Sequence, residues 1–222
     1  SDCSILSFEP VKHLTTGEGG AITTNSKEIY EKLLELRMHG MNRTSFKDES
    51  MSKDLKGNMN PWYYEMHSLG YNYRITDFQC ALGLSQFKKL DSFIQRRKEI
   101  AKNYDKAFLN SKIKPLYIFD DKSSYHLYVV KFDFSSISMS KAELFNQMRE
   151  KNIGLQLHYI PINKQPYYVS LGYGKENTPV MEKYYEECFS LPMYPLLSDE
   201  EQQYIINNLF DILKEKNEIC KL

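Results

Sequence analysis

A lysine, a serine and a glycine-rich turn lie close together near the start of this 222-residue chain. Lys12 stands between Ser7 and the sequence TTGEGG at residues 15–20. A lysine amine attacks a carbonyl only when it is deprotonated, and partial desolvation favours that form. Hydroxyls and the backbone N–H groups of a glycine-rich turn suit a phosphate. The pattern predicts a site for a phosphorylated cofactor that forms a Schiff base, although a solvated lysine before an ordinary turn has the same local sequence.

Two strands are expected to position Lys12. Residues 5–8 indicate a buried strand that enters the turn, and GAITT at residues 20–24 indicates a strand that leaves it. We expect the two strands to pair antiparallel, with their turn at residues 17–20.

A helix and a polar segment follow these strands. Asn25, with Glu28 at capping-box spacing, predicts the start of the helix, and Gly40 predicts its end. From about 41 to 61 the chain is polar and without period, which indicates an exposed insert. The aromatic run WYY at residues 62–64 closes it. These rings either pack in a core, which is the favoured interpretation, or offer a platform to a sugar.

A long amphipathic helix is expected from residue 78 to about 108, where it bridges two parts of the chain. Apolar residues recur there at spacings of three and four. They are Phe78, Ala81, Leu82, Phe87, Leu90, Phe93, Ile94, Ala101 and Tyr104.

The part beyond this helix alternates between strand and helix signals. Alternating residues at 125–134 and an apolar run at 153–160 indicate strands. Capping boxes predict two helix starts, Ser140 with Glu143 and Ser198 with Glu201. A smaller domain of mixed α/β type is therefore expected.

Composition excludes several classes of function. The chain has 29 lysines and arginines and 29 aspartates and glutamates, so its formal net charge is zero. This charge balance argues against binding to nucleic acid or to an anionic membrane. Cys3, Cys80, Cys188 and Cys220 lie far apart, which argues against a metal site and against a disulfide-stapled secreted domain. No apolar run approaches the roughly 20 residues that span a bilayer. We expect a soluble protein in a reducing cytoplasm.

Several motifs occur in the order and spacing of one family. They are SFxPxKxxTTGEGG at 7–20, RxHG at 37–40, YNYRITDxQxAxG at 71–83, HYxPI at 158–162 and LPxY at 191–194. Together they resemble the pyridoxal-phosphate (PLP) sugar aminotransferases of the DegT/DnrJ/EryC1/StrS family. The resemblance implies an α/β fold, the PLP-dependent transferase fold type I of the aspartate aminotransferase kind.

The resemblance also implies a domain organisation. Residues 1–90 match the remainder of the large PLP-binding domain, with the insert at about 41–61, and residues 91–222 match the bridging helix and the small C-terminal α/β domain. In the family, the aspartate that pairs with the pyridinium nitrogen, the aromatic residue that stacks on the ring and the phosphate loop all precede the lysine. The chain is therefore expected to be the C-terminal part of such an enzyme.

Individual residues match the PLP site of the family. Lys12 matches the lysine that forms the Schiff base and moves the proton, and Ser7 matches the serine that binds the cofactor phosphate. Asn72 matches an asparagine that reaches the phosphate of the neighbouring subunit, which implies a homodimer with a shared active site. Glu9 departs from the histidine or small polar residue of many relatives. The alternatives are that Ser7 caps a turn and that Asn72 is a left-handed turn residue.

Three further residues are candidates for substrate binding. His158 and Tyr159 match the place where the small domain of the family approaches the nucleotide-sugar. His158 is otherwise a hydrogen-bonded structural histidine. Arg74 either contacts the substrate or pairs with Asp77 or another carboxylate at the helix start.

The reaction implied is transamination of a UDP-linked 4-keto-6-deoxy-N-acetylhexosamine, with L-glutamate as the amino donor. The sequences WYYE at 62–65 and LGLSQxKKLD at 82–91 favour the branch of the family that serves bacterial pseudaminic acid biosynthesis. Lys12 distinguishes the chain from the dehydratase branch, where histidine takes that position. Two alternatives stay open. One is another sugar aminotransferase, of the perosamine, bacillosamine or 4-amino-arabinose type, and the other is a catalytically silent fragment that only dimerises.

Overall fold

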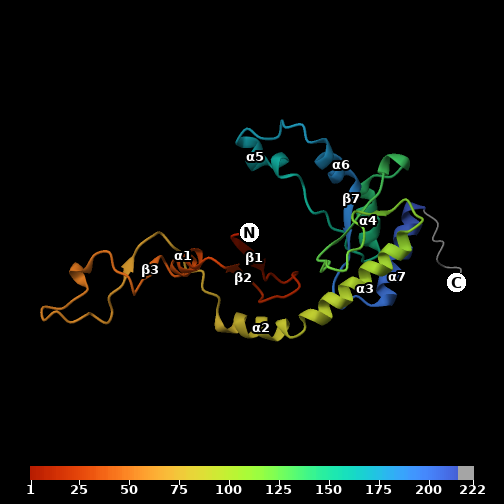
Figure 1. Ribbon diagram of the computed structural model, residues 1–222. Coiled ribbons are helices and arrows are strands. Elements are labelled where there is room, and N and C mark those ends of the chain that lie inside the picture. The colour runs from red at the N-terminus through yellow and green to blue at the C-terminus, as the bar shows by residue number, and fades with distance from the viewer. Residues whose placement is uncertain (215–222) are drawn as a thin grey trace. The chain divides into compact units, whose positions relative to one another are not determined.

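The computed structural model describes residues 1–214, with only the backbone of Glu49, so that Cys220 lies outside the described residues. The chain forms two compact units, which meet in the sequence between Lys89 and Leu90 (Figure 1). This division lies beside the predicted boundary at residue 90. That the two units are the end of a large domain and a small domain stays a prediction.

The first unit begins with the predicted pair of antiparallel strands, but residues 8–19 join them and the turn predicted at residues 17–20 is wrong. Strand β1 (Cys3–Ser7) pairs antiparallel with strand β2 (Gly20–Thr24), and Ser7 lies opposite Gly20. The prediction that the first strand is buried is wrong for this unit. Ile5 is 77% exposed, because a two-stranded sheet consists of edges and covers little of its own apolar surface.

Helix α1 (Lys27–Arg37) follows the hairpin. Its N-cap is Ser26, whose hydroxyl accepts the Ile29 N–H, so the start predicted at Asn25 with Glu28 is wrong by one residue. The predicted glycine stop is confirmed. Gly40 takes a left-handed φ of 69°, and its N–H donates to the carbonyl of Glu35.

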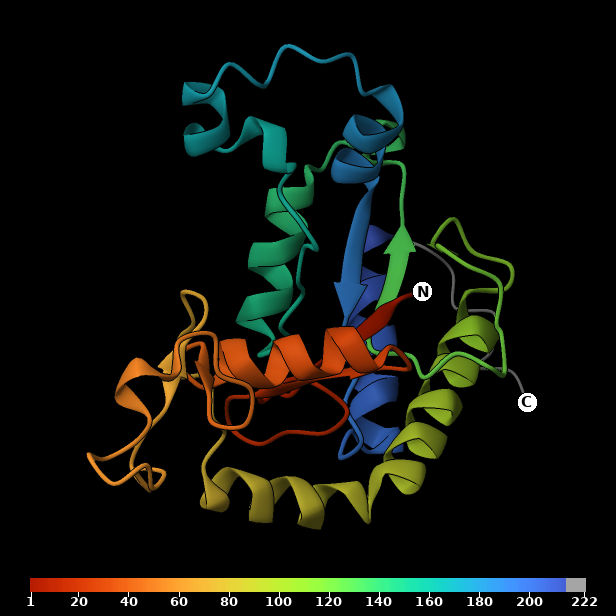
Figure 2. The same cartoon turned by 60° about the vertical axis from the view of Figure 1, so that its left-hand side comes forward.

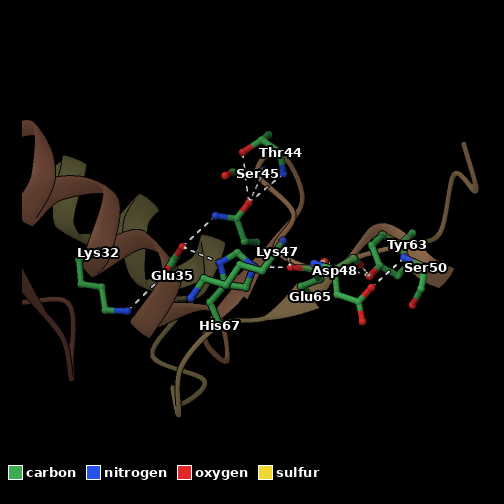
Figure 3. A network of polar contacts seen from close by, with 11 residues as sticks. Lys32, Glu35, Thr44, Ser45, Lys47, Asp48, Ser50, Tyr63, Glu65 and His67 are labelled. Atoms are coloured by element: carbon green, nitrogen blue, oxygen red, sulfur yellow. Dashed lines mark hydrogen bonds and ion pairs between the residues drawn. The ribbon is translucent and has the colours of Figure 1, made fainter. Parts of the chain in front are cut away.

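The polar insert is exposed, as predicted, but it is organised by one carboxylate (Figure 3). Strand β3 (Met41–Asn42) pairs with strand β4 (Glu65–Met66), and the 3-10 turn η1 (Glu49–Met51) lies between them. The Glu65 carboxylate accepts the backbone N–H groups of Lys47 and Asp48 at 2.6 and 2.9 Å. It also accepts the Tyr63 hydroxyl at 3.0 Å and lies 2.6 Å from Nε2 of His67.

The aromatic run that closes the insert does not form a core. Trp62 is 73% exposed, and the Tyr64 ring lies beneath the guanidinium of Arg43, so the favoured interpretation of packing is wrong for both. Tyr63 alone packs, edge to face against Phe46. The physical reason is that the insert holds its shape by hydrogen bonds to Glu65, which need no apolar interior.

The single long helix predicted from residue 78 is wrong, because two helices occupy this part of the chain. Helix α2 (Asp77–Phe87) begins with a capping box between Thr76 and Gln79, and helix α3 (Leu90–Phe108) follows. A tight turn ends the α-helical ladder between them, where Lys89 donates its N–H to Gln86. The apolar spacing continues across the turn, but the apolar side chains of α2 are mostly exposed, whereas those of α3 are half-buried or buried.

The second unit contains a three-stranded antiparallel sheet in the order β5-β6-β7. Its strands are β5 (Lys114–Pro115), β6 (Tyr128–Lys131) and β7 (Cys188–Leu191). Its helices besides α3 are α4 (Lys141–Glu150), α5 (Pro166–Ser170), α6 (Pro179–Glu187) and α7 (Asp199–Leu213), with short 3-10 turns η2 (Phe134–Ser136) and η3 (Ile162–Lys164). Helices α3, α4 and α7 gather around the strands (Figure 2).

Predictions for this unit succeed at helices α4 and α7, miss helices α5 and α6, and fail at one strand. Both capping boxes, at Ser140 and Ser198, are present. The strand predicted at 125–134 shortens to β6, and the strand predicted at 153–160 is wrong. Gln156 alone pairs there, exchanging two hydrogen bonds with Ser190 as an isolated bridge. Two residues further on, the carbonyl of His158 accepts the hydroxyl of Tyr184.

The apolar core of the second unit lies between the sheet and these helices. Its largest fully buried side chains are Tyr104, Phe108, Phe132, Phe189, Phe210, Ile100, Ile113, Leu144, Met148, Leu197, Leu209 and Leu213. The buried Arg97 crosses this region and donates through Nη1 to three backbone carbonyls.

Three other observations bear on the predictions from composition. Within residues 1–214, Cys3, Cys80 and Cys188 are free thiols. The same residues hold no group of three His, Cys, Asp or Glu side chains that suits a metal ion. None of the helices described there has both the length and the apolar character that crossing a bilayer requires.

Candidate functional site

Lys12 lies in a loop that the ends of the hairpin hold closed. Phe8 forms the base of the loop, because its N–H donates to the carbonyl of Gly19 and its own carbonyl accepts the N–H of Thr16 and the hydroxyl of Thr15. Lys12 itself turns back on Glu9 through a backbone hydrogen bond of 3.1 Å. The loop is therefore fixed at its two ends, and Lys12 is carried between them.

The start of helix α2 supports this loop from outside. The side-chain amide of Gln79 donates to the carbonyl of Glu18 at 2.8 Å. Thr16 is buried, and its hydroxyl donates to the same carbonyl. A Cβ on Gly83 would stand 2.8 Å from the Thr16 methyl group, so glycine is needed for the helix to approach this closely.

The donor set of the loop fits a phosphorylated Schiff-base cofactor. Lys12 is half-buried, and its amine has no hydrogen bond or ion pair with the residues that the structure describes. The Ser7 hydroxyl, at the end of β1, is likewise without a partner among residues 1–214, so the interpretation of Ser7 as a turn cap is wrong. The loop thus carries a free amine at Lys12, and a free hydroxyl lies just before it at Ser7. Both groups are available to a ligand.

Asn72 and Arg74 lie on the extended segment before helix α2. Asn72 is not among the residues with a positive φ, so the alternative of a left-handed turn residue is wrong. Its backbone pairs with Met38 as an isolated bridge. The Arg74 guanidinium contacts the Met38 sulfur and the His39 ring, and within the described chain it forms no ion pair with Asp77 or another carboxylate.

The two groups of candidate residues in the first unit are joined only indirectly. No hydrogen bond or ion pair within residues 1–89 links Lys12 or Ser7 to Asn72 or Arg74. The link between them is the Gln79 contact at the start of α2, which fixes the helix that follows Arg74 to the turn that follows Lys12.

His158 and Tyr159 belong to the second unit. Nδ1 of His158 lies 2.8 Å from the hydroxyl of the buried Ser190, and the His158 carbonyl accepts the Tyr184 hydroxyl at 2.9 Å. Burial lowers the pKa of His158, which favours its neutral form. Tyr159 is 71% exposed and meets the His158 ring edge to face at 4.8 Å. His158 is thus a hydrogen-bonded histidine beside an accessible aromatic ring.

Four residues that position these candidates were not predicted from the sequence. Gln79 holds the lysine loop, His39 contacts Arg74, and Ser190 and Tyr184 hold His158. His39 belongs to the motif RxHG and Gln79 to the motif YNYRITDxQxAxG, so the sequence motifs could have pointed to both residues. For Ser190 and Tyr184 the sequence carries no local signal, because sheet pairing and helix packing bring them to His158.

Comparison with known proteins finds relatives that match nearly the whole of this chain. The profile of the DegT/DnrJ/EryC1/StrS aminotransferase family matches residues 1–210. The spore coat polysaccharide biosynthesis protein SpsC of Bacillus subtilis is 36% identical over 96% of this chain and 54% of its own length. The UDP-4-amino-4,6-dideoxy-N-acetyl-beta-L-altrosamine transaminase of Campylobacter jejuni (strain 81-176) is 36% identical over 97% of this chain and 53% of its own.

Solved structures give the same result. PseC of Helicobacter pylori, an aminotransferase involved in the biosynthesis of pseudoaminic acid, superposes with a TM-score of 0.82 at 32% identity, over 96% of this chain and 54% of its own. The PLP-form of Spr1654 of Streptococcus pneumoniae superposes with a TM-score of 0.81 at 29% identity, over 96% of this chain and 52% of its own. The chain thus spans about half the length of the relatives it matches.

Proposed function

Because this chain belongs to the DegT/DnrJ/EryC1/StrS aminotransferase family, we propose that it supplies the Schiff-base lysine of a PLP-dependent nucleotide-sugar aminotransferase. Membership of the family confirms the predicted α/β fold of type I PLP-dependent transferases. The observation that carries the proposal is the free amine of Lys12 in a loop fixed at both ends.

Lys12 has two tasks in this proposal. Its amine holds the cofactor covalently, and after release by the amino donor it moves a proton between two carbon atoms on one side of the ring. Pyridoxal phosphate, when bound, supplies the electron sink that makes this proton removable. The fixed ends of the loop matter because both tasks need one amine in one place.

The other candidate residues bind and orient in this proposal. The Ser7 hydroxyl donates to the cofactor phosphate, and Asn72 reaches the phosphate of a neighbouring subunit, which makes the enzyme a homodimer with shared active sites. Arg74, His158 and Tyr159 contact the substrates. Arg74 supplies positive charge, and His158 with Tyr159 supplies a polar ring beside an exposed aromatic face.

The substrate we propose is a UDP-linked 4-keto-6-deoxy-N-acetylhexosamine. L-Glutamate gives up its amino group and leaves as 2-oxoglutarate, and C4 of the keto sugar becomes the carbon that bears the amine. Transaminases named for this sugar series, at 34 to 36% identity, support the assignment to pseudaminic acid biosynthesis. We assign the reaction to the cytoplasm, a reducing compartment that suits three free thiols.

One other proposal has support of its own. The likeness to SpsC, a protein of spore coat polysaccharide biosynthesis, supports a sugar aminotransferase with another keto sugar. The alternative of a catalytically silent module that only dimerises is decided by the labelling experiment that follows.

The test is chemical labelling of Lys12. The protein is mixed with pyridoxal phosphate, reduced with borohydride and digested, and we expect a peptide with a pyridoxyl group on Lys12. The variant Lys12→Arg keeps the charge but cannot form the Schiff base, so the label disappears. The control Lys27→Arg, on the exposed face of α1, keeps the label at Lys12.

The outcomes separate the proposals. Labelling of the 222-residue chain supports a cofactor site that forms within it. Labelling only of a longer protein that contains the chain supports the silent module. Absence of the label in both contradicts the aminotransferase. Amine transfer from L-glutamate to the UDP-linked keto sugar, followed by mass spectrometry with other nucleotide-sugars in parallel, then decides the substrate.

A further inference from the structure

The RxHG motif at residues 37–40 has no role in the function proposed so far, and the structure joins it to the segment that carries Asn72 and Arg74. Backbone hydrogen bonds connect the two segments in register. They run from Tyr71 N–H to Leu36 O at 3.0 Å, from His39 N–H to Tyr71 O at 3.0 Å and from Tyr73 N–H to Arg37 O at 3.1 Å. The end of helix α1 therefore serves as the template on which residues 71–74 are held extended.

Residues 71–74 consequently present two faces. Side chains alternate along an extended segment, so Tyr71 and Tyr73 share one face and Asn72 and Arg74 share the other. The two tyrosine rings stack with centroids 5.4 Å apart, as this alternation requires. The Arg74 N–H also points to the Asn72 side-chain oxygen, at 3.4 Å.

His39 lies against the guanidinium of Arg74. The Arg74 Nη1 atom lies 3.3 Å from Nε2 of His39 and 2.9 Å from the Met38 sulfur. Nη1 carries two hydrogens, so these two acceptors use both of them. The Nε and Nη2 atoms have no partner among residues 1–214. The free edge of the guanidinium is therefore the Nε–Nη2 fork.

Hydrogen bonds of the main chain also fix the backbone of His39. Its φ is 59°, in the left-handed region where histidine and asparagine are enriched among non-glycine residues. Its N–H is bonded to Tyr71, and the next residue, Gly40, is bonded to Glu35. The Cα of His39 is thus held beside the Arg74 segment, and the contact with Nη1 of Arg74 orients the ring. Nε2 must carry no proton if it accepts from a cation.

We propose that His39 is a positioning residue, which holds Arg74 by Nη1 so that the Nε–Nη2 fork faces a reactant oxyanion on the same face as Asn72. This proposal rests on the proposed function, since it assumes that Arg74 meets a reactant. Such a fork binds a carboxylate or a phosphate through two parallel hydrogen bonds. The oxyanion has two sources, the carboxylate of the amino donor and the diphosphate of the nucleotide-sugar.

A matched pair of variants tests the role of Nε2. His39→Gln places an amide oxygen near the position of Nε2 and keeps the acceptor. His39→Met has a similar size, is equally unbranched at Cβ and meets the same left-handed backbone, but it offers no acceptor of comparable strength. The probes are glutarate for the donor carboxylates and UDP for the diphosphate, with binding to the full chain measured by calorimetry and by the NMR signal of the Arg74 Nε–H.

We expect the Met variant to bind one of the probes about tenfold more weakly, with a broadened Arg74 signal, and the Gln variant to stay within about twofold of the native affinity. A loss confined to glutarate assigns the fork to the amino donor, and a loss confined to UDP assigns it to the nucleotide-sugar. In an Arg74→Gln background, His39→Met should produce no further loss, because His39 acts only through Arg74.

Three results overturn the proposal. They are equal losses in the Gln and Met variants, a further loss from His39→Met in the Arg74→Gln background, and native affinity in the Met variant for both probes. Thermal unfolding of each variant shows whether an equal loss comes from misfolding. The proposed function fails separately, through absence of the borohydride label at Lys12, because anion binding at Arg74 is measured without the cofactor.

Discussion

Different kinds of interaction stabilise the interior of each of the two units. Every buried apolar side chain within residues 1–214 lies at Ile100 or beyond, in the second unit. The first unit buries only small or polar residues, which are Thr16, Gly40, Ser52 and Gly83. Its order comes from backbone hydrogen bonds between distant segments, from close approaches at glycine and from carboxylates that cap turns.

This difference matters because the lysine loop belongs to the unit without an apolar core. Buried apolar area stabilises by roughly 25 cal/mol per Å², so the second unit has a source of stability that the first unit lacks. In the first unit, single polar contacts therefore carry a larger share of the local order. A small number of these polar contacts holds each of the segments that carry Lys12, Asn72 and Arg74. We therefore expect the loss of one contact to displace a functional side chain more than it changes the overall stability of the unit.

The largest expected effect compares the same substitution in the two units. Phe108 is fully buried between the rings of Tyr104 and Phe210, and Phe78 is 91% exposed on helix α2. Phe108→Ala should lower the free energy of unfolding of the second unit by about 3–5 kcal/mol, because it leaves a cavity. Phe78→Ala should change the stability of the first unit by less than about 0.5 kcal/mol. Native-state hydrogen exchange reports both.

A large cost for Phe78→Ala would break the comparison. It would mean that this face of α2 is covered in solution, since an exposed ring contributes little to stability. The measurement can be repeated across a hundredfold range of protein concentration. If a second copy of the chain covers Phe78, the free-energy cost of Phe78→Ala depends on the protein concentration, and otherwise it does not.

The second prediction concerns close approach in the first unit. A Cβ on Gly70 would lie 2.3 Å from the Gly40 nitrogen and 2.7 Å from the Leu36 oxygen, and neither backbone atom can rotate away. Gly70→Ala should therefore cost about 1–3 kcal/mol locally, as overpacking does. We expect faster amide exchange at His39, Tyr71 and Tyr73. The control is Gly154→Ala in the second unit, where nothing lies within 4 Å of the added atom. Equal exchange in the two variants would contradict the pairing of residues 36–40 with 70–74.

The contrast also explains which predictions from sequence succeed. Capping boxes at Ser140 and Ser198 are confirmed because all of their atoms lie within one turn of helix. The antiparallel pairing of the strands on either side of Lys12 is confirmed, but the turn predicted at residues 17–20 is wrong, because the longer segment 8–19 joins the strands. The helix break at Lys88 and Lys89 could not be predicted, because the apolar spacing continues across it and only the surroundings of the two helices differ.

For the candidate site, the lysine motif is visible in the sequence and its supports are not. The pairing of His39 with Arg74 depends on backbone hydrogen bonds between segments that the whole insert separates. Likewise, His158 receives Ser190 from a strand and Tyr184 from a helix. Periodicity describes which face of an element is apolar, but it carries no information about which distant segment that face will meet.

The smallest expected effect concerns the Glu65 carboxylate that organises the insert. Desolvation raises its pKa, but the hydrogen bonds from Lys47, His67, Asp48 and Tyr63 outweigh this and lower the pKa from 4.5 to about 2. A depressed pKa stabilises the folded form above the unfolded value, so the contribution is complete above about pH 4.5 and is lost as the pH falls toward 2. Protection of the Lys47 and Asp48 amides from hydrogen exchange, taken relative to the intrinsic exchange rate at each pH, should therefore fall between about pH 4 and 2. Glu65→Gln should open the insert already at neutral pH and remove most of this pH dependence, whereas the exposed control Glu31→Gln should leave it unchanged. The pKa values of Glu35, Asp48 and Asp54 are lowered as well. An unchanged profile in Glu65→Gln would therefore assign the pH dependence to these three carboxylates and remove Glu65 from the centre of the network.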